Sequence, residues 1–299
     1  MYGRPCSYVG GNLLPNGIII IDKPVDWTSQ DVVSKLRGIL REKRIGHGGT
    51  LDPMATGVLP VFVGRATRAV EFFESAQKEY VAGLKLGLVT NTQDTTGETE
   101  REQEVHVTRQ QLEEVLERFK GVQQQLPPMF SAVKIGGRKL YEMARQGKSV
   151  ERKPRTIEIP ELELLDGSDA DWTIRVKCSK GTYIRTLCHD IGQVLGCGGC
   201  MSALRRTQAG CYGLAQAVTL EQVQNGDYTF LPVDSLFSHL PAVTVTKLKP
   251  IYNGAAVPMK ELPDGQYRVY SPEGEFLMVG QAEQGMLKTV KSFFEVKSL

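Results

Sequence analysis

A glycine-dense loop at residues 46–53 gathers side chains that could do chemistry. Its sequence, Gly-His-Gly-Gly-Thr-Leu-Asp-Pro, contains His47, Thr50 and Asp52. Glycines let a backbone approach a ligand closely, and Asp-Pro favours a turn. No Gly-Lys-Ser/Thr follows, so the loop is not a nucleoside triphosphate P-loop. A carboxylate and an imidazole on a glycine frame predict acid–base or nucleophilic chemistry, although an aspartate before proline is also an ordinary turn residue.

The cysteines offer a second, weaker candidate site. The pair Cys197-Gly-Gly-Cys200 has the spacing of zinc ligands, and Cys188 and Cys211 could complete a tetrahedral set. Structural zinc sites usually show two such pairs, and this chain has one. Cysteines at apolar positions such as Cys178 and Cys188 also behave as small hydrophobic residues. We therefore expect reduced thiols and no bound metal, and keep zinc as an alternative.

Charge is unevenly distributed along the chain. The 299 residues carry 36 Lys and Arg against 34 Asp and Glu, a net charge of +2. Residues 133–155 have eight basic and two acidic residues, whereas residues 93–118 have eight acidic and three basic ones. A local basic segment predicts an anionic partner, although a solvated surface helix gives the same pattern.

The glycine-dense loop at 46–53 lies between a predicted helix and a predicted strand that can hold it in place. Gly17–Asp22 is an apolar run typical of a buried strand. Thr28-Ser29 caps a helix predicted to end near Gly46, directly before the loop, and Val58–Val63 follows the loop as a strand. Tyr80–Leu86 is a further strand.

The segments after residue 90 include both helical and strand-like hydrophobic patterns. Polar residues 91–100 predict a loop or hairpin, and capping boxes open helices at Thr108 and Thr219. A short helix is expected at 139–146. Residues 157–159 and 172–178 alternate as antiparallel strands do, and 183–195 have helical period.

Composition describes a folded α+β protein with a small appendix. Hydrophobic residues make up 41% of the chain, and no apolar stretch approaches the roughly 18–20 residues that span a bilayer. The first fifteen residues lack a secretory signal pattern, which predicts a cytoplasmic protein. After Pro241 come four short strand signals, 243–245, 267–270, 276–279 and 293–296. We predict a large domain at 1–240, carrying an insertion at about 127–155, and a β-rich domain at 241–299.

Five sequence blocks in order resemble one family. Gly46–Leu59 closely resembles the catalytic signature of the TruB family of tRNA pseudouridine synthases. The other blocks resemble further family motifs: Gly-Ile-Ile-Ile-Ile-Asp-Lys-Pro at 17–24 with Thr28-Ser29, Lys-Glu-Tyr at 78–80, Cys-Ser-Lys-Gly-Thr-Tyr-Ile-Arg at 178–185 and Leu-Arg-Arg-Thr at 204–207. Together they cover roughly residues 17–207, and an ordered set is far more specific than any single block.

The resemblance implies a fold and an activity. The fold is a mixed, largely antiparallel sheet with flanking helices, followed by a small PUA-like RNA-binding domain at 241–299. The activity is isomerisation of the T-loop uridine conventionally numbered 55 in tRNA, by a monomer without metal, nucleotide or redox cofactor. Asp52 would be the nucleophile, attacking either the base or the sugar, with Arg185 as its cationic partner. Tyr80 would stack on the flipped uracil and handle its C5 proton.

The resemblance also implies binding residues. Tyr183 and Leu204 would line the uridine pocket, Lys23 would support the site, and His47 would contact the RNA where the base has left the stack. The basic insertion would grip the tRNA T-arm through phosphate contacts. Its candidate residues are Lys134, Arg138, Lys139, Arg145, Lys148 and Arg152.

One departure and two alternatives remain. The family usually has glycine where this chain has Asp26, and aspartate tolerates the left-handed backbone better than most residues. A non-catalytic tRNA chaperone would use the same clamp, and a related synthase would modify a uridine in another RNA stem-loop.

Overall fold

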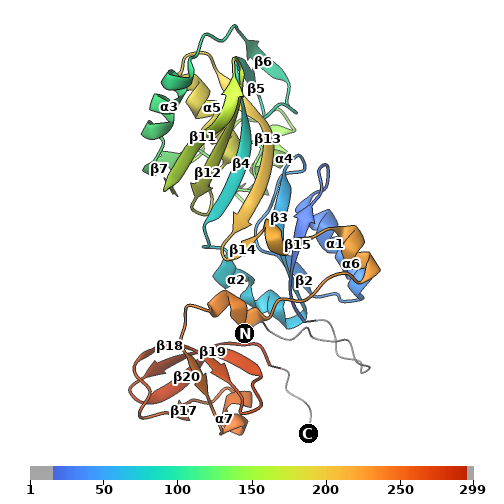
Figure 1. Cartoon of the computed structure of the whole chain (residues 1–299), viewed down its shortest axis with the longest axis vertical. Coiled ribbons are helices and arrows are strands. Elements are labelled where there is room, and N and C mark those ends of the chain that lie inside the picture. The colour runs from blue at the N-terminus through green and yellow to red at the C-terminus, as the bar shows by residue number, and fades with distance from the viewer. Residues whose placement is uncertain (1–15, 295–299) are drawn as a thin grey trace.

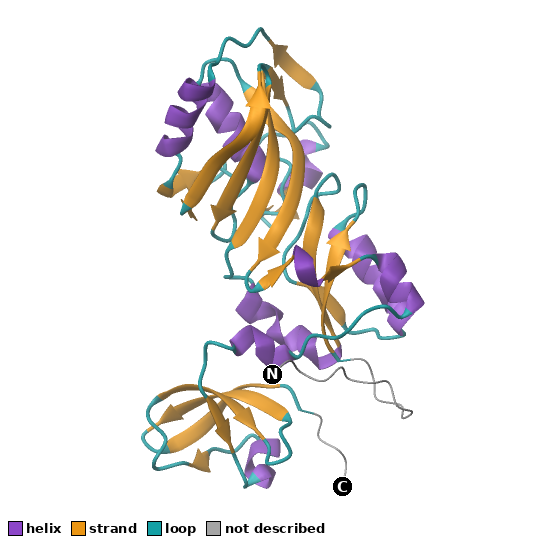
Figure 2. Ribbon diagram, viewed as in Figure 1, coloured by secondary structure: helices purple, strands orange, loops and turns teal. Residues whose placement is uncertain are grey.

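A long mixed sheet organises the molecule. The computed structural model describes residues 16–294 (Figures 1 and 2). Within them a nine-stranded sheet has the order β11-β12-β4-β13-β3-β1-β15, with β14 paired to β13 and β2 to β3. The strands are β1 Gly17–Lys23, β2 Ile45–His47, β3 Thr56–Val63, β4 Lys78–Leu86, β11 Glu161–Ser168, β12 Asp171–Cys178, β13 Gly199–Ala209, β14 Tyr212–Gly213 and β15 Ala217–Val218.

The sheet has two halves that meet at one short junction. Strands β11, β12, β4 and β13 pair antiparallel, as do β3 and β1. Only two residue pairs, Arg205 with Thr56 and Arg206 with Gly57, join β13 to β3 in parallel. The expected mixed, largely antiparallel sheet is confirmed, and the 46–53 loop leads into the strand at this junction.

Helices cover both halves of the sheet (Figure 2). Helices α3 Arg109–Arg118 and α5 Ile184–Val194 lie against the strands at the upper left of Figure 1. Helices α1 Ser29–Leu40 and α6 Leu220–Asn225 lie beside β15 at the right, near mid-height. The capping boxes at Thr28, Thr108 and Thr219 are all formed. Among residues 16–294 no helix is long and apolar enough to span a membrane.

Two expected boundaries are wrong. The helix that begins at Ser29 ends at Leu40, well before Gly46, because Arg41 adopts a left-handed conformation (φ 53°) and the chain turns into β2. The strand signal at 293–296 is absent at its two described residues: β20 ends at Ser292, and Phe293 and Phe294 are buried aromatic side chains outside a strand. Residues 295–299, like Cys6 and the first fifteen residues, lie outside the described part.

The basic insertion emerges from a pair of strands. Strands β7 Gly121–Gln125 and β10 Arg155–Ile159 pair antiparallel, with Gln125 opposite Arg155, so the two ends of the insertion lie side by side. Between them are the hairpin β8 Lys134–Ile135 and β9 Arg138–Lys139 and the short helix α4 Leu140–Ala144. The 88–102 segment forms another hairpin, β5 Leu88–Thr90 with β6 Thr99–Glu102.

A second sheet forms the C-terminal part. It has five strands, β16 Ala242–Thr244, β17 Val257–Pro258, β18 Gly265–Tyr270, β19 Phe276–Glu283 and β20 Met286–Ser292, with α7 Leu248–Tyr252. Phe237 packs on Phe276 and Phe293, and Lys291 pairs with Glu71 of α2 Val70–Phe73, so this sheet is attached to the larger part. The described residues also include three short 3-10 helices, Gly64–Ala69, Leu214–Gln216 and Val233–Phe237.

Candidate active site

The Asp52 loop is held by backbone and side-chain contacts from β1 and α1. Ser29 Oγ accepts a hydrogen bond from Leu51 N (2.8 Å) and donates one to Leu51 O (3.2 Å). The Asp26 N–H donates to Pro53 O at 2.9 Å. Asp26 has φ 64°, so the left-handed turn survives the replacement of glycine. The turn at Asp26 and the 46–53 loop are therefore bonded to each other and form one structural unit.

Asp52 meets Arg185 across the sheet junction. Arg185 Nε donates to Asp52 Oδ2 at 2.9 Å; the aspartate side chain is 39% exposed and the arginine 6%. The other guanidinium nitrogens donate to the carbonyls of Thr92 (3.1 Å) and Phe130 (2.9 Å). An arginine held at three points presents a fixed positive charge to a carboxylate that solvent can reach.

A second carboxylate, Asp94, shares this arginine, and no sequence motif indicates it beyond the turn composition of residues 91–100. Asp94 Oδ2 lies 3.7 Å from Arg185 Nε and its side chain is 8% exposed. Its Oδ1 accepts hydrogen bonds from Thr92 Oγ1 (2.8 Å), Thr96 Oγ1 (2.6 Å) and Thr96 N (3.0 Å). Asp94 therefore places a second negative charge beside Arg185 Nε and helps to position the guanidinium.

Lys23 anchors the loop from below. Its side chain is fully buried, and Nζ donates to the carbonyls of Pro24 (2.8 Å), Trp27 (2.5 Å) and Pro53 (3.1 Å). Burial lowers the pKa of Lys23 to about 8, partly offset by the carboxylates of Asp26 and Asp52. Lys23 has no exposed surface, so its place beneath the loop favours the supporting role that the resemblance implies.

Two expected pocket residues lie on neighbouring strands of the upper half. Tyr80 on β4 is 9% exposed, and desolvation raises the pKa of its phenol. Leu204 on β13 is 8% exposed and lies opposite Ala82 of β4. The negative charge of Asp52 also raises the pKa of Tyr80, so the two groups lie within electrostatic reach of each other.

Tyr183 and His47 are the remaining candidate binding residues. Tyr183 is the N-cap of α5, half-buried, and its backbone N–H and C=O bond the Gln125 side chain at 2.8 and 3.0 Å. His47 on β2 is half-buried, and its Nδ1 has no hydrogen-bond partner. Desolvation, helped by the charge of Arg206, lowers the pKa of His47, which favours the neutral imidazole.

The insertion exposes most of its basic residues. Lys134, Arg138, Arg145 and Lys148 are exposed, and no residue of 133–155 lies within ion-pair distance of a carboxylate in the described chain. Two candidates differ. The half-buried Lys139 contacts the Tyr141 hydroxyl at 3.3 Å. Arg152, also half-buried, donates to Pro127 O at 2.9 Å, which ties the insertion's two ends together.

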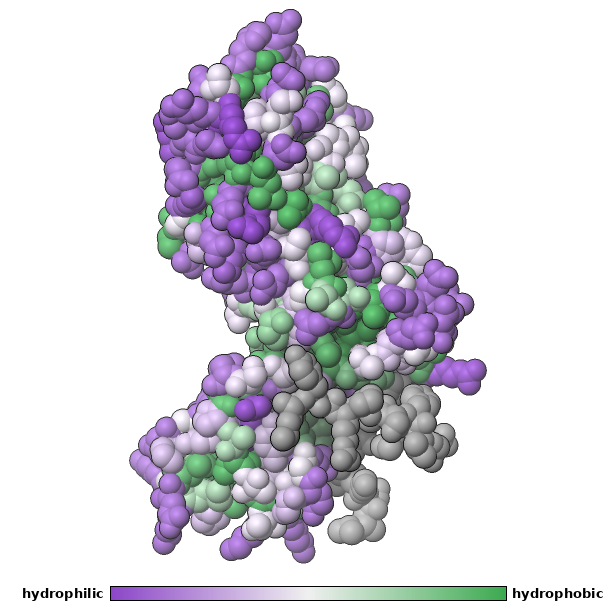
Figure 3. Space-filling view, viewed as in Figure 1, coloured by the Kyte–Doolittle hydropathy of each residue, from purple (hydrophilic) through white to green (hydrophobic). Residues whose placement is uncertain are grey.

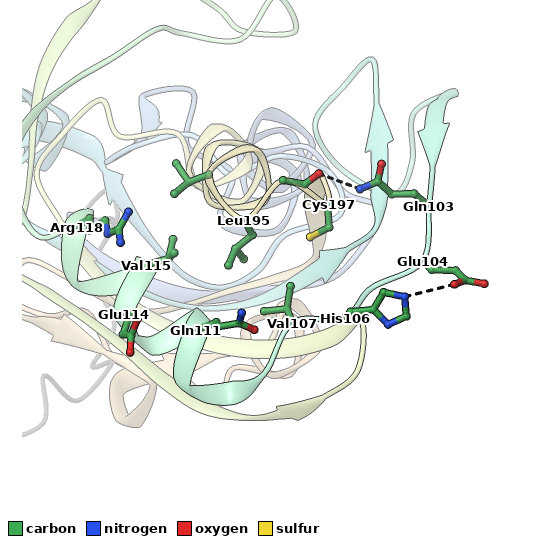
Figure 4. Close-up of a pocket in the computed structure, with 12 residues that line it drawn as sticks. Gln103, Glu104, His106, Val107, Gln111, Glu114, Val115, Arg118, Leu195 and Cys197 are labelled. Carbon is green, nitrogen blue, oxygen red and sulfur yellow. Dashed lines mark hydrogen bonds and ion pairs between the residues drawn. The ribbon is translucent and has the colours of Figure 1, made fainter.

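The described residues contain no group of ligands for the zinc site kept as an alternative. Within residues 16–294 no three His, Cys, Asp or Glu side chains are grouped to hold a metal ion. Cys200 is fully buried inside β13, and burial raises its pKa to about 11. Cys197 lines a surface hollow between α3 and the end of α5 (Figure 4), where none of the candidate catalytic residues lies. The surface around α3 is hydrophilic (Figure 3).

Comparisons with known proteins give consistent matches. The family model described as TruB family pseudouridylate synthase (N terminal domain) matches residues 37–184, and that of the tRNA pseudouridylate synthase B C-terminal domain matches residues 185–238. The chain is 45% identical over 282 residues to tRNA pseudouridine synthase B of Syntrophomonas wolfei, covering 89% of this chain and 93% of that protein. It is 44% identical to the protein of the same name from Azoarcus sp., covering 91% and 93%.

Solved structures share the fold. One, of an H/ACA RNP bound to a substrate RNA containing 2′-deoxyuridine, aligns with a TM-score of 0.70 and 26% identity over 93% of this chain and 85% of that one. Another, of a Cbf5-Nop10-Gar1 complex, aligns with a TM-score of 0.69 and 30% identity, with the same coverage.

Proposed function

The chain belongs to the TruB family of pseudouridylate synthases, which are isomerases, and from that premise we propose that it converts the T-loop uridine 55 of tRNA to pseudouridine. The relatives named as tRNA pseudouridine synthase B support tRNA as the substrate. We further propose a cytoplasmic enzyme, with 1–240 as catalytic domain and 241–299 as an RNA-binding domain.

The reaction exchanges one glycosidic bond for another. The N1–C1′ bond breaks, a C5–C1′ bond forms, and the C5 proton is replaced by a proton on N1. We assign Asp52 as the nucleophile that attacks the nucleoside, at either the base or the sugar. The observation that carries this assignment is the solvent-accessible Asp52 carboxylate, bonded at 2.9 Å to an arginine that three other protein groups hold in place. Such preorganised geometry is what a weak nucleophile needs.

The substrate base must leave its RNA stack before it meets Asp52. Extruding a base costs a few kcal/mol, which protein–RNA contacts have to offset. The exposed, unpaired basic side chains of the 127–155 insertion are suited to phosphate oxygens, and phosphate contacts position an RNA without reading its sequence. Tyr80 is proposed to stack on the flipped uracil and to take its C5 proton, with Tyr183 and Leu204 lining the pocket.

Mapping pseudouridines in cells with and without the gene tests this function. We expect position 55 of tRNAs to become unmodified uridine in the deletion strain, and the parental gene to restore the modification. A loss confined to another RNA stem-loop would identify a related synthase. Unchanged modification everywhere, with tRNA binding retained by the purified protein, would leave the chaperone alternative.

A further inference from the structure

Arg206 is a buried cation at the sheet junction, separate from the Asp52–Arg185 ion pair. It lies on β13, where its Cα pairs with Tyr80 of β4 on one side and Gly57 of β3 on the other. Its side chain is 1% exposed. Directly opposed residues of an antiparallel pair point to the same face, with Cβ atoms roughly 5 Å apart. Arg206 and Tyr80 are therefore side-chain neighbours.

The guanidinium clamps both ends of the catalytic loop. Nε donates to Val58 O at 2.6 Å, and Nη2 donates to Gly49 O at 3.2 Å. Gly49 precedes Asp52 and Val58 follows it. The backbones pack closely here too: a Cβ on Gly57, which has φ 97°, would lie 2.2 Å from Arg206 O. Arg206 thus fixes the loop that presents Asp52.

No carboxylate neutralises this charge. Within the described residues Arg206 has no ion pair; two of its guanidinium nitrogens donate to backbone carbonyls, and its side chain also interacts with the Tyr80 phenol. The titratable groups that feel its charge, from the elements packed around it, are Lys23, His47, Lys78, Tyr80 and Cys178. A buried charge without a counter-ion is costly, so its presence calls for a reason.

The phenol of Tyr80 supplies that reason. Desolvation raises the pKa of Tyr80, and Asp52 and Cys178 raise it further; the charge and hydrogen bonding of Arg206 oppose this rise. Negative charge on the phenol oxygen would find in Arg206 a cation that no carboxylate already neutralises.

We propose that Arg206 is a positioning residue of the isomerisation: it holds the Asp52 loop and the Tyr80 phenol, and stabilises negative charge on the phenol oxygen. This inference rests on the proposed function. In the step concerned, Tyr80 has first given its proton to water. The C5–H bond then breaks, its electron pair forms the C5–C6 double bond, and the C6–N1 double-bond electrons move to N1. The proton goes to the Tyr80 oxygen, and N1 takes one from water, so protons balance.

Two substitutions separate charge from hydrogen bonding. Arg206→Gln keeps a hydrogen-bond donor and loses the positive charge. Arg206→Lys keeps the positive charge and loses the planar set of guanidinium donors. We expect the single-turnover rate of Arg206→Gln to fall about 10²-fold, the scale of a lost acid–base contribution. Its pH–rate midpoint should move to higher pH, because the phenol loses its cation. Arg206→Lys should lose less and keep the parental midpoint. If one variant fails to fold, the other still carries the test.

Controls keep the outcomes distinct. Arg205→Lys changes the adjacent arginine, which pairs with Asp22 at 2.8 Å, and should leave rate and pH profile unchanged. In a Tyr80→Phe background, Arg206→Gln should cost much less than in the parent. A lower rate with an unshifted midpoint and full additivity with Tyr80→Phe would overturn the inference. Parental activity in Tyr80→Phe would instead remove the proposed role of Tyr80 itself.

Discussion

The basic insertion and the buried residues beneath the Asp52 loop, here called the floor of the site, both contain Lys and Arg. The two regions use these side chains in opposite ways. In the insertion, residues such as Arg138 and Lys148 are exposed and lack carboxylate partners. In the floor, Lys23, Arg185 and Arg206 are buried, and each donates to two or more backbone carbonyls.

The difference teaches what burial does to a cation. An exposed charge is hydrated and screened by salt, so it attracts phosphates over a distance without fixing their position. A desolvated charge bonded to carbonyls is immobile, and it acts on the few groups beside it. We infer that the insertion recruits RNA and the floor organises chemistry, and substitutions in the two regions should therefore affect different measurements.

The largest effect after loss of Asp52 itself is expected at Arg185. Arg185→Lys keeps the charge but cannot reach Asp52, Thr92 and Phe130 at once, so the single-turnover rate should fall about 10²–10³-fold. tRNA affinity should stay within about threefold, measured by filter binding. An unchanged rate would show that the fixed ion pair is not needed.

A smaller loss of activity is expected at Lys23. Lys23→Met leaves the carbonyls of Pro24, Trp27 and Pro53 without their donor and loosens the Asp52 loop, so the rate should drop about tenfold. Single-turnover kinetics with saturating enzyme measures this. Parental rates would mean that the loop holds its shape without the anchor.

The same variant tests the lowered pKa of Lys23. Its folded pKa of about 8 lies below the ordinary 10.5, so the unfolded chain binds more protons between these values. The parental free energy of unfolding should therefore gain a contribution from Lys23 as pH rises from about 8 to 10.5, and Lys23→Met should lack it. Lys78, whose pKa burial also lowers to about 8, is the matched control: Lys78→Met should retain the Lys23 contribution. Urea unfolding at several pH values measures the difference, and equal slopes in parent and Lys23→Met would contradict it.

Substitutions in the insertion should weaken tRNA binding and leave the rate of the chemical step unchanged. Replacing Lys134, Arg138 and Lys148 with Gln should weaken tRNA binding and flatten its salt dependence, by about 0.9 in log–log slope for each lost duplex phosphate contact. The rate at saturating enzyme should stay near the parental value. As control, Lys85, Arg175 and Lys177 can be replaced together, since each already pairs with a carboxylate at 2.6–2.8 Å. Equal salt slopes in both triple variants would leave the insertion as ordinary surface.

Sequence patterns predict the elements in which buried positions carry apolar residues and exposed positions carry polar ones. The apolar run at 17–22 and the alternation at 172–178 correspond to β1 and β12, and three capping boxes are formed as expected. The longest strand of the main sheet, β13, was missed. It places the charged Arg206 at a buried position, and irregularities between Met201 and Ala203 and between Arg206 and Gln208 interrupt its alternation.

The candidate site was predictable where a motif carried it. Asp52 and Arg185 are 133 residues apart, and only the family resemblance placed them together before the structure brought them to 2.9 Å. No role is predicted for Asp94, which lies in a stretch of ordinary turn residues, or for Arg206, which stands in the Leu-Arg-Arg-Thr block but has a charged side chain at a buried position. Their importance depends on three-dimensional neighbours, which periodicity does not encode.

The most direct test of the central claim is tritium release from tRNA labelled at C5 of uridine 55 alone. Parental enzyme should release the label as the C5 proton exchanges for the new glycosidic bond. Asp52→Asn, which keeps the shape of the side chain and removes its charge, should release none above background while binding tRNA as the parent does. Release by Asp52→Asn at the parental rate would contradict the assignment of Asp52 as the nucleophile.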